Sequence, residues 1–328
     1  MDTPVNLRLE DLTSRNEKMA RCLKLAELAA KSEVPVLILG ETGTGKTLLA
    51  RAVHNSSSRA SGPFISFNAS AMADTLLESQ LFGHERGAFT GALKTTKGKF
   101  ELANSGTLFF DEIADMSALA QAKILRAVEY GEFERLGGER ILRSDARIIS
   151  ATNRSLEQDI RDGKFREDLF HRLKGVILSV PPLRERPEDL PALIAAQLKA
   201  ATRSAGRKIT EIHPEAMAKL LNHEWRGNLR EVHHVIQTVV LFCEGNAVCP
   251  EHIVIEESHD RQPPNAGPPV PEHAKEEAGA GGMLLSAAIE SHIRAVFERA
   301  GRNRRQTARL LGISRARLAR HMANWPEI

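Results

Sequence analysis

Short apolar runs alternate with helical patterns along the first 180 residues. Four runs are rich in β-branched and aromatic residues and show little alternation of polar and apolar positions: VPVLILG, FISFNA, GTLFFDE and ARIISAT. Strands buried on both faces of a parallel sheet have this composition. Between the last two runs, SALAQAKILRAVEYG has helical spacing, with Ser117 as N-cap and Gly131 at its end. The pattern predicts an α/β fold with a parallel sheet sandwiched by helices.

The rest of the chain divides into three segments. From residue 181 to about residue 255 the periodicity is helical only, which predicts a smaller all-α subdomain. Residues 256–282 hold five Pro and four Gly, and Val270 is their only large apolar residue, so they are typical of a linker. We therefore expect an α/β subdomain over 1–180, a helical subdomain over 181–255, and a third domain over 283–328.

Composition restricts the class of protein. The chain has 42% hydrophobic and 27% charged residues, no run of 18 or more apolar residues, and no apolar signal core at its N-terminus. Its three cysteines, Cys22, Cys243 and Cys249, lack metal-ligand spacing. We expect a cytoplasmic protein with reduced thiols and no membrane insertion.

The C-terminal segment is basic and has helical periodicity. Residues 283–328 contain nine Arg, no Lys and three Glu, a net charge of +6, whereas the whole chain carries +3. This asymmetry suggests nucleic acid. One apolar stripe consists of Ile289, Ile293, Val296, Phe297 and Ala300.

After this stripe, NRRQTARLLG precedes a glycine turn at Gly312, and Ser314 is the N-cap of RARLARHMANW. Helices joined by such a turn predict a helix-turn-helix, in which Leu318 and Met322 face inward. A small three-helix oligomerisation module is the alternative. The candidate DNA contacts are Arg315, Arg317, Arg320 and His321.

GETGTGKT is a complete G-x-x-x-x-G-K-[ST] motif between the strand VLIL and the helical run KTLLARAVH. Its glycines would let backbone N–H groups surround phosphates, and the helix N-terminus adds positive charge. Lys46 would reach the β- and γ-phosphates, and Thr47 would bind Mg²⁺. A chance glycine-rich turn is the alternative. The predicted nucleotide-binding residues are Gly40, Glu41, Thr42, Gly43, Thr44, Gly45, Lys46 and Thr47.

Polar side chains end three of the predicted strands. Asp111 is placed to hold Mg²⁺ through water, and Glu112 to orient or deprotonate the attacking water. An Asp-Glu pair after a strand is usually a solvated helix start, but the phosphate loop favours the catalytic interpretation. Asn153 could sense the γ-phosphate or position water, with a turn-capping role as the alternative. Asn68 is similarly placed, with a weaker claim to a catalytic role.

Two further features have no assignment from spacing alone. In KFREDLFHRL, Arg166 and Arg172 are six residues apart and would point about 120° apart on a helix, which favours a surface charge run. GHERGAFTGALK, residues 83–94, has neither a helical stripe nor strand alternation, and its glycines favour a mobile loop. It nevertheless presents Phe89, which an idle surface loop does not need.

Taken together, these motifs resemble those of the sigma-54-dependent transcriptional activators, the bacterial enhancer-binding proteins of the AAA+ ATPase superfamily. The resemblance covers nearly the whole chain outside the linker. It rests on GETGTGKT, ESQLFGHERGAFTGA, GTLFFDEIADM, FREDLFHRL, PPLRERPEDL and WRGNLREV. It implies ATP and Mg²⁺ as cofactors, ATP hydrolysis in a ring that is usually a hexamer, and sigma-54 RNA polymerase holoenzyme as the partner remodelled from closed to open complexes.

The resemblance also assigns roles to residues. Arg166 and Arg172 align with arginine fingers that enter the ATP site of the neighbouring subunit, and Arg230 aligns with a lid arginine that senses nucleotide. Arg226 stands where the family usually has Pro, a departure that concerns the local turn and not Arg230. The loop that contacts sigma-54 would rise while ATP is held and retract after hydrolysis; its residues are Gly87, Ala88, Phe89, Thr90, Gly91 and Ala92.

The C-terminal segment resembles the Fis-type domain that ends this family, which implies binding to upstream double-stranded DNA; Ala319 stands where the family often has an aromatic residue. Only 39 residues precede Gly40, and most of residues 1–33 follow the pattern of one amphipathic helix. We therefore expect no N-terminal regulatory domain, and restraint, if any, by a separate protein, by abundance or by nucleotide supply. Two alternatives are a DNA-binding regulator that uses ATP only to switch assembly, and a generic AAA+ unfoldase.

Overall fold

The structure is a computed structural model. It describes residues 6–70, 73–255, 293, 296–297, 302–310, 318 and 322. Contacts divide the chain into two compact units, Met1–Glu256 and Glu257–Ile328. Within the described residues, no helix is both long enough and apolar enough to span a bilayer.

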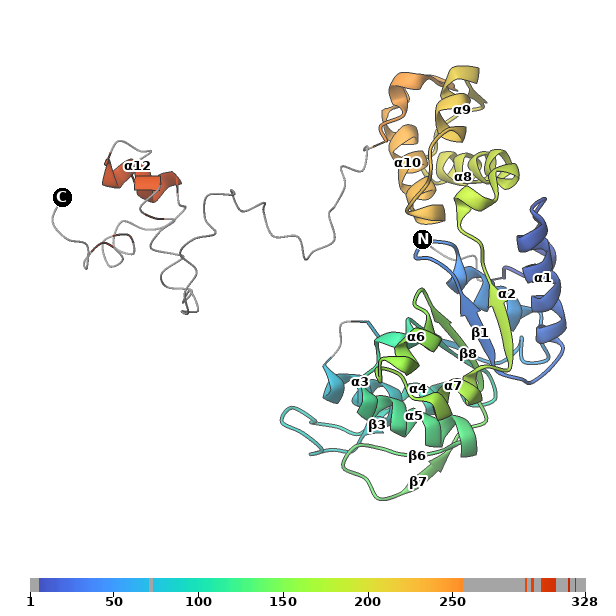
Figure 1. Ribbon diagram of the computed structural model, residues 1–328, viewed down its shortest axis with the longest axis vertical. Coiled ribbons are helices and arrows are strands. Elements are labelled where there is room, and N and C mark those ends of the chain that lie inside the picture. The colour runs from blue at the N-terminus through green and yellow to red at the C-terminus, as the bar shows by residue number, and fades with distance from the viewer. Residues whose placement is uncertain are drawn as a thin grey trace. The chain divides into compact units, whose positions relative to one another are not determined.

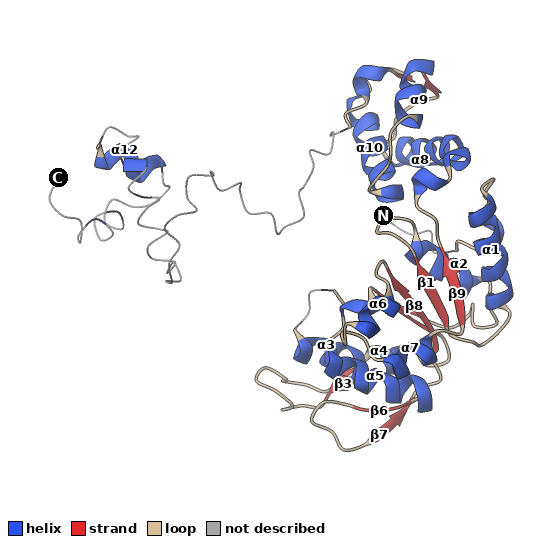
Figure 2. Cartoon of the chain, viewed as in Figure 1, coloured by secondary structure: helices blue, strands red, loops and turns tan. Residues whose placement is uncertain are grey.

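A five-stranded parallel sheet forms the centre of the first unit (Figure 2). Its strands lie in the order β2–β5–β8–β1–β9, and every neighbouring pair is parallel. Four of them coincide with the four apolar runs, so the predicted α/β fold is confirmed, while β9 was not predicted. The bounds are β1 Val36–Leu39, β2 Phe64–Asn68, β5 Thr107–Asp111, β8 Arg147–Thr152 and β9 Val176–Ser179.

Helices cover both faces of this sheet, which explains the lack of alternation in its strands. In β5, Phe109 belongs to the core formed with α1 and α2, whereas Leu108 and Phe110 belong to the core on the opposite face. The helices of this subdomain are α1 Glu17–Ala30, α2 Lys46–Asn55, α3 Asp74–Phe82, α4 Lys99–Leu102, α5 Ala118–Tyr130, α6 Leu156–Arg161 and α7 Glu167–Leu173 (Figure 1), with 3-10 turns η1 Leu9–Asp11 and η2 Ile113–Asp115.

Helix α5 has the predicted ends. The Ser117 side chain accepts a hydrogen bond from the Ala120 backbone N–H, and Gly131 ends the helix in the left-handed conformation at φ +69°. Two short antiparallel pairs lie outside the main sheet: β3 Gly83–His84 with β4 Thr96–Lys97, and β6 Glu132–Glu134 with β7 Ile141–Arg143.

The N-terminal segment differs from its prediction as one long helix. Asn16 caps α1 by accepting from the Met19 backbone N–H, so the helix begins only at Glu17. Before the cap, the Ser14 hydroxyl and the Arg15 backbone N–H donate to the Asp189 carboxylate, at 2.5 and 2.7 Å. These contacts replace the helical hydrogen bonds that the amphipathic pattern suggested.

The helical subdomain over residues 181–255, called the lid from here on, has three helices packed around Trp225. Trp225 is fully buried and donates from Nε1 to the Leu220 carbonyl. It also contains one two-residue parallel pair, so the prediction of helices only was wrong in that detail; so short a pair leaves no periodicity in a sequence. The elements are η3 Leu183–Glu185, η4 Pro187–Asp189, α8 Leu190–Ser204, β10 Glu211–Ile212, α9 Pro214–Leu221, α10 Asn228–Phe242, β11 Ala247–Val248 and η5 Pro250–His252.

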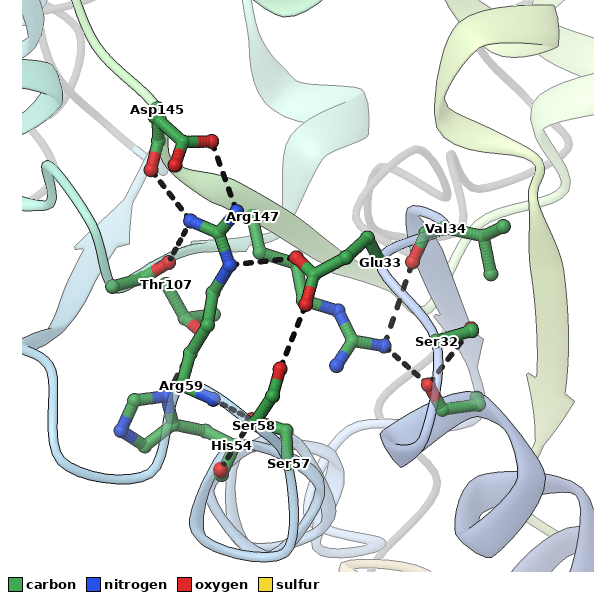
Figure 3. Close-up of polar contacts among 12 residues, drawn as sticks. Ser32, Glu33, Val34, His54, Ser57, Ser58, Arg59, Thr107, Asp145 and Arg147 are labelled. Carbon is green, nitrogen blue, oxygen red and sulfur yellow. Dashed lines mark hydrogen bonds and ion pairs between the residues drawn. The ribbon is translucent and has the colours of Figure 1, made fainter.

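A polar cluster holds the amino ends of the strands, at the edge of the sheet opposite the phosphate loop (Figure 3). Arg59 donates to Glu33 at 2.6 Å and to Asp145 at 2.9 Å. Arg147, the first residue of β8, is almost fully buried and donates from Nη2 to the Ala29 carbonyl at 2.6 Å. The cluster ties the end of α1 to the start of the sheet.

In the second unit, the structure gives the bounds of helix α12, Arg304–Leu310, and describes a small apolar cluster. Ile293, Ala308 and Leu318 are buried in this cluster, and Met322 packs against them. The inward positions expected of Leu318 and Met322 agree with this. Arg315, Arg317, Arg320, His321 and the predicted linker lie outside the described residues, so the helix-turn-helix stays a prediction.

Candidate functional site

The phosphate loop lies at the carboxyl edge of the sheet, between β1 and α2. Gly43 and Gly45 have φ of +81° and +100°, a conformation that glycine adopts without strain. Lys46, the first residue of α2, is only 5% exposed, and its Nζ donates to the Gly40 carbonyl at 2.9 Å. Its ammonium group also lies 3.5 Å from Glu112 Oε1. The loop therefore directs a buried cation to the edge of the sheet, while contact of Lys46 with phosphates stays a prediction.

Asp111, the last residue of β5, and Glu112, the residue after it, lie at the same edge. The Thr47 hydroxyl lies 3.4 Å from Asp111 Oδ2, so two oxygen ligands suited to Mg²⁺ stand side by side. Among the described residues, no group of three or more His, Cys, Asp or Glu could hold a metal.

Glu112 has an unusual backbone. Its φ of +53° is uncommon for a residue with a side chain, and such strain is concentrated at functional sites. The conformation sets its carboxylate between two groups of the site: Lys46 Nζ near Oε1, and the Asn153 backbone N–H, 3.2 Å from Oε2.

The two candidate asparagines have different surroundings. Asn153 donates from Nδ2 to the Thr42 hydroxyl at 2.9 Å, so it contacts the phosphate loop directly. Asn68 is paired with Asp111 in the register of β2 and β5. Its Oδ1 accepts from the Ser70 backbone N–H at 2.8 Å, a turn-capping contact. The structure thus brings Asn153 into the phosphate loop and Asn68 beside Asp111.

Arg230 lies in the first turn of α10, and its Cβ is close to Gly43. Two other residues near the loop were not predicted from sequence, namely Arg184 of η3 and Asn228 at the start of α10. Both contact Glu41. They fall inside PPLRERPEDL and WRGNLREV, but nothing in either motif indicates which distant residue it contacts.

Arg166 and Arg172 make their ion pairs away from the phosphate loop of this chain. Arg166 is the N-cap of α7 and has extended backbone, so the expectation that both are on one helix was wrong. Its guanidinium pairs with Asp168 at 2.6 Å, while Arg172 pairs with Glu129 of α5. About half of each arginine side chain is exposed, 45% and 54%.

The GAFTGA segment forms an open loop between β3 and β4, and in Figure 1 this hairpin extends outward beyond α3. Gly87 and Gly91 have φ of +86° and +105°, and a Cβ added to either would meet no atom within 4 Å. The Phe89 side chain is 41% exposed, and its ring centroid lies 5.0 Å from that of His84. The loop therefore presents an apolar side chain on a glycine-rich support.

The base of this loop is held firmly. Arg135 donates to Glu85 at 2.8 Å and to Glu101 at 2.6 Å. Hydrogen bonds from the Thr95 hydroxyl and from Arg135 lower the pKa of Glu85. At Glu101, burial raises the pKa, but the hydrogen bonds from Arg135 and the Gly98 backbone N–H outweigh it, so the pKa is lowered there as well. Gly83 approaches the backbone of Thr96 so closely that an added Cβ would lie 2.4 Å from its carbonyl oxygen. The loop can therefore be displaced only together with the strands that carry it, or by bending at its own glycines.

Comparison with known proteins identifies the family of the chain. A model of the sigma-54 interaction domain matches residues 12–179, and a model of the AAA+ ATPase lid domain matches residues 184–267. A phosphate loop on a parallel sheet, followed by a helical lid, defines an AAA+ ATPase domain. The chain belongs to the sigma-54 interaction family of these domains, the family of the sigma-54-dependent transcriptional activators.

Similar proteins are transcriptional regulators. The chain is 41% identical over 303 residues to the Nif-specific regulatory protein of Azotobacter vinelandii, covering 92% of this chain and 56% of that protein. It is 48% identical over 244 residues to the formate hydrogenlyase transcriptional activator FhlA of Escherichia coli K12, covering 74% of this chain and 35% of FhlA. The chain thus spans about half or less of the length of these relatives.

Among solved structures, NtrX from Brucella abortus in complex with ATP is 33% identical, with a TM-score of 0.67. That match covers 95% of this chain and 68% of NtrX. NtrX in complex with ADP gives a TM-score of 0.68 at 34% identity.

Proposed function

We propose that the protein is an ATP-dependent transcriptional activator that binds upstream DNA and converts closed complexes of sigma-54 RNA polymerase into open ones. The observation that carries the proposal is the combination of two features in one domain. A complete phosphate loop with two carboxylates lies at the edge of the sheet, and an open loop with exposed Phe89 projects from the same domain. A generic unfoldase would not need the second feature or a basic C-terminal segment.

The chemistry proposed for the site is hydrolysis of ATP. Backbone N–H groups of residues 40–47 and the Lys46 ammonium hold the phosphates, and Thr47 and Asp111 hold Mg²⁺. Bound Mg²⁺ supplies neutralisation of phosphate charge. Glu112 orients the attacking water and accepts its proton, since its carboxylate is already fixed at the edge of the sheet. Asn153 positions Glu112 relative to the phosphate loop, because it donates hydrogen bonds to both.

Arg166 and Arg172 are proposed to complete the ATP site of a neighbouring subunit in a homo-oligomeric ring, a hexamer as is usual in the family. Both arginine side chains are about half-exposed and form ion pairs near the surface, and exposed pairs are typically worth about 0–1 kcal/mol. A γ-phosphate can therefore compete for them. A finger supplied in trans contributes roughly 10³–10⁵ to the rate in related hydrolases.

Two further parts of the chain are proposed to bind the partners of the ATPase domain, namely the GAFTGA loop and the C-terminal segment. Residues 87–92 contact sigma-54 through Phe89 and Thr90, supported by their exposure and by the glycines on either side. The segment 283–328 binds double-stranded DNA, supported by its net charge of +6 and the spacing of its arginines. Such a protein works in the bacterial cytoplasm.

The test is in vitro transcription with sigma-54 holoenzyme on a supercoiled promoter that carries upstream sites. We expect open complexes with hydrolysable ATP and Mg²⁺, and none with a non-hydrolysable analogue. Equal opening with the analogue would instead support the second candidate, a DNA-binding regulator that uses ATP only to switch assembly.

A further inference from the structure

An ion pair joins the phosphate loop to the lid. Both terminal nitrogens of Arg184 donate to the Glu41 carboxylate, Nη1 to Oε2 at 2.8 Å and Nη2 to Oε1 at 2.6 Å. A bidentate pair of this kind fixes orientation as well as distance. Arg184 lies in η3, the first element after the edge strand β9. Glu41 is the second residue of the phosphate loop. The two are 143 residues apart in the chain.

Asn228 reinforces this pair from the lid side. Its side chain is completely buried, and its Nδ2 donates to the Thr42 carbonyl at 3.1 Å and lies 3.3 Å from Glu41 Oε2. Its Oδ1 accepts from the Leu183 backbone N–H at 2.7 Å. Asn228 thus bridges η3, the start of α10 and the phosphate loop. It does so with φ of +56°, a conformation that asparagine tolerates better than most residues.

The phosphate loop and the lid are closely packed around these contacts. A Cβ added at Gly43 would lie 2.3 Å from the Gly227 carbonyl oxygen. The buried Arg186 donates from Nη2 to the Thr44 carbonyl at 3.3 Å. Residues 41–44 of the loop are therefore each in contact with, or pressed against, the lid, while the other side of Thr42 is held by Asn153.

We propose that Glu41, Arg184 and Asn228 form a loop–lid clasp, which sets the position of the lid so that the phosphate loop and Arg230 meet the same nucleotide. Glu41 and Arg184 then act as positioning residues for ATP. The inference rests on the proposed ATP binding. It gives Glu41 a task that the phosphate-loop pattern does not require, since that pattern specifies only glycines, Lys and Ser or Thr.

A clasp made before the nucleotide arrives lowers the ordering cost of binding. Its loss should therefore weaken affinity rather than the chemical step. The pair is 45% and 42% exposed, so its contribution is that of a surface pair, and substitution should not unfold the domain. Asn228 is less suitable for a test, because its fully buried amide is tied to three segments and its loss could disrupt the lid.

The experiment measures binding of a fluorescent N-methylanthraniloyl derivative of ADP to the full chain. Variants are Glu41→Gln, Arg184→Gln and the double variant. We expect each single variant to weaken binding about three- to fivefold, the size of an exposed ion pair. The double variant should bind no more weakly than the weaker single variant, because both changes remove one interaction. Melting temperatures without nucleotide should match the wild type.

Lys18→Gln is the matched control. Lys18 pairs with Glu185 at 2.6 Å, in the same turn as Arg184, but from α1 and not from the phosphate loop. We expect it to bind the probe like the wild type. Wild-type affinity in all Glu41 and Arg184 variants would overturn the clasp, as would effects that multiply in the double variant or that accompany a lower melting temperature. Failure of the wild type itself to bind would instead overturn the proposed function, and the clasp with it.

Discussion

The phosphate loop and the GAFTGA loop both depend on left-handed glycines, but the two regions use them for different reasons. At Gly43 a side chain is excluded twice, by φ of +81° and by the Gly227 carbonyl 2.3 Å from the position of a Cβ. At Gly87 and Gly91 only the backbone angle excludes it, because no atom lies within 4 Å. One loop is enclosed by its neighbours, and the other is open.

This difference agrees with the two tasks proposed for the domain. A site that must hold phosphates while water attacks gains from groups fixed in advance, since no reorganisation is then needed during reaction. A loop that must reach another protein gains from few local contacts, because regions that move have low local stability. We infer that nucleotide is received at the rigid edge of the sheet and that force is delivered by the open loop.

The largest expected effect is on ATP turnover, because Arg172 is proposed to complete the nucleotide site of a neighbouring subunit. Arg172→Ala should lower ATP turnover by about 10³-fold or more, as for other fingers supplied in trans. Mixing it with Lys46→Ala should restore part of the activity, because some interfaces then combine an intact loop with an intact finger. ATPase assays over a series of mixing ratios test this, with native mass spectrometry to confirm mixed rings. No recovery in confirmed mixed rings would contradict fingers in trans.

Glu112→Gln should separate binding from chemistry within the rigid site. The amide keeps the shape of the side chain but is a poor proton acceptor, so we expect turnover to fall about 10²–10⁴-fold while nucleotide is still bound. Steady-state ATPase and equilibrium binding of ATP measure the two parts. Normal turnover would remove Glu112 from its proposed role.

The glycine comparison can be tested directly with paired alanine variants. Gly43→Ala must displace the lid or the loop, so we expect nucleotide binding to be lost. Gly91→Ala has only backbone strain to overcome, about 1–3 kcal/mol, and should retain nucleotide binding. Calorimetric titration with ADP measures both. Comparable ADP affinities in the two variants would show that the close packing around the phosphate loop does not contribute to nucleotide binding.

The smallest expected effect lies at the amino edge of the sheet, far from both loops. His54 is buried with Nδ1 2.8 Å from the Thr107 hydroxyl, and burial, with the nearby Arg51 charge, lowers its pKa below the ordinary value. The unfolded chain takes up this proton near pH 6.5, before the folded protein does. Stability should therefore fall as the pH drops below about 6.5.

Urea unfolding at pH 7.5 and 5.5 checks this expectation. The free energy of unfolding should decrease less between these pH values in His54→Gln than in the wild type. An identical decrease in both would assign the acid sensitivity to other groups, and the nucleotide affinity of His54→Gln should follow the wild type throughout.

Much of the α/β fold could be predicted from sequence because its signals are local. The strand that ends at Asp111 is apolar at every inner position, and the Gly40–Thr47 spacing defines its own loop. The lid contacts of that loop carry no such signal. Arg184 and Asn228 meet Glu41 across 143 and 187 residues, and a charged or amide side chain is compatible with solvent as well as with a partner.

Local signals also misled where a tertiary contact competed with them. The amphipathic pattern before α1 predicted a longer helix. Instead, the Asp189 carboxylate accepts hydrogen bonds from the Arg15 backbone N–H and the Ser14 hydroxyl. Arg166 looks helical in sequence, yet it is a cap whose backbone N–H donates to the Gln121 side chain at 2.8 Å. Both errors lie where a side chain from a distant segment satisfies a backbone donor.

The most direct test of the central claim measures ATPase activity and open-complex formation on the same preparation of Thr90→Ala. Thr90 is exposed in the open loop, so its loss should leave nucleotide turnover close to that of the wild type. Open complexes at a sigma-54 promoter should fall to the level seen with Lys46→Ala, in which ATPase activity is lost as well. Normal promoter opening by Thr90→Ala would contradict the division of the molecule into a rigid nucleotide site and a loop that acts on the polymerase.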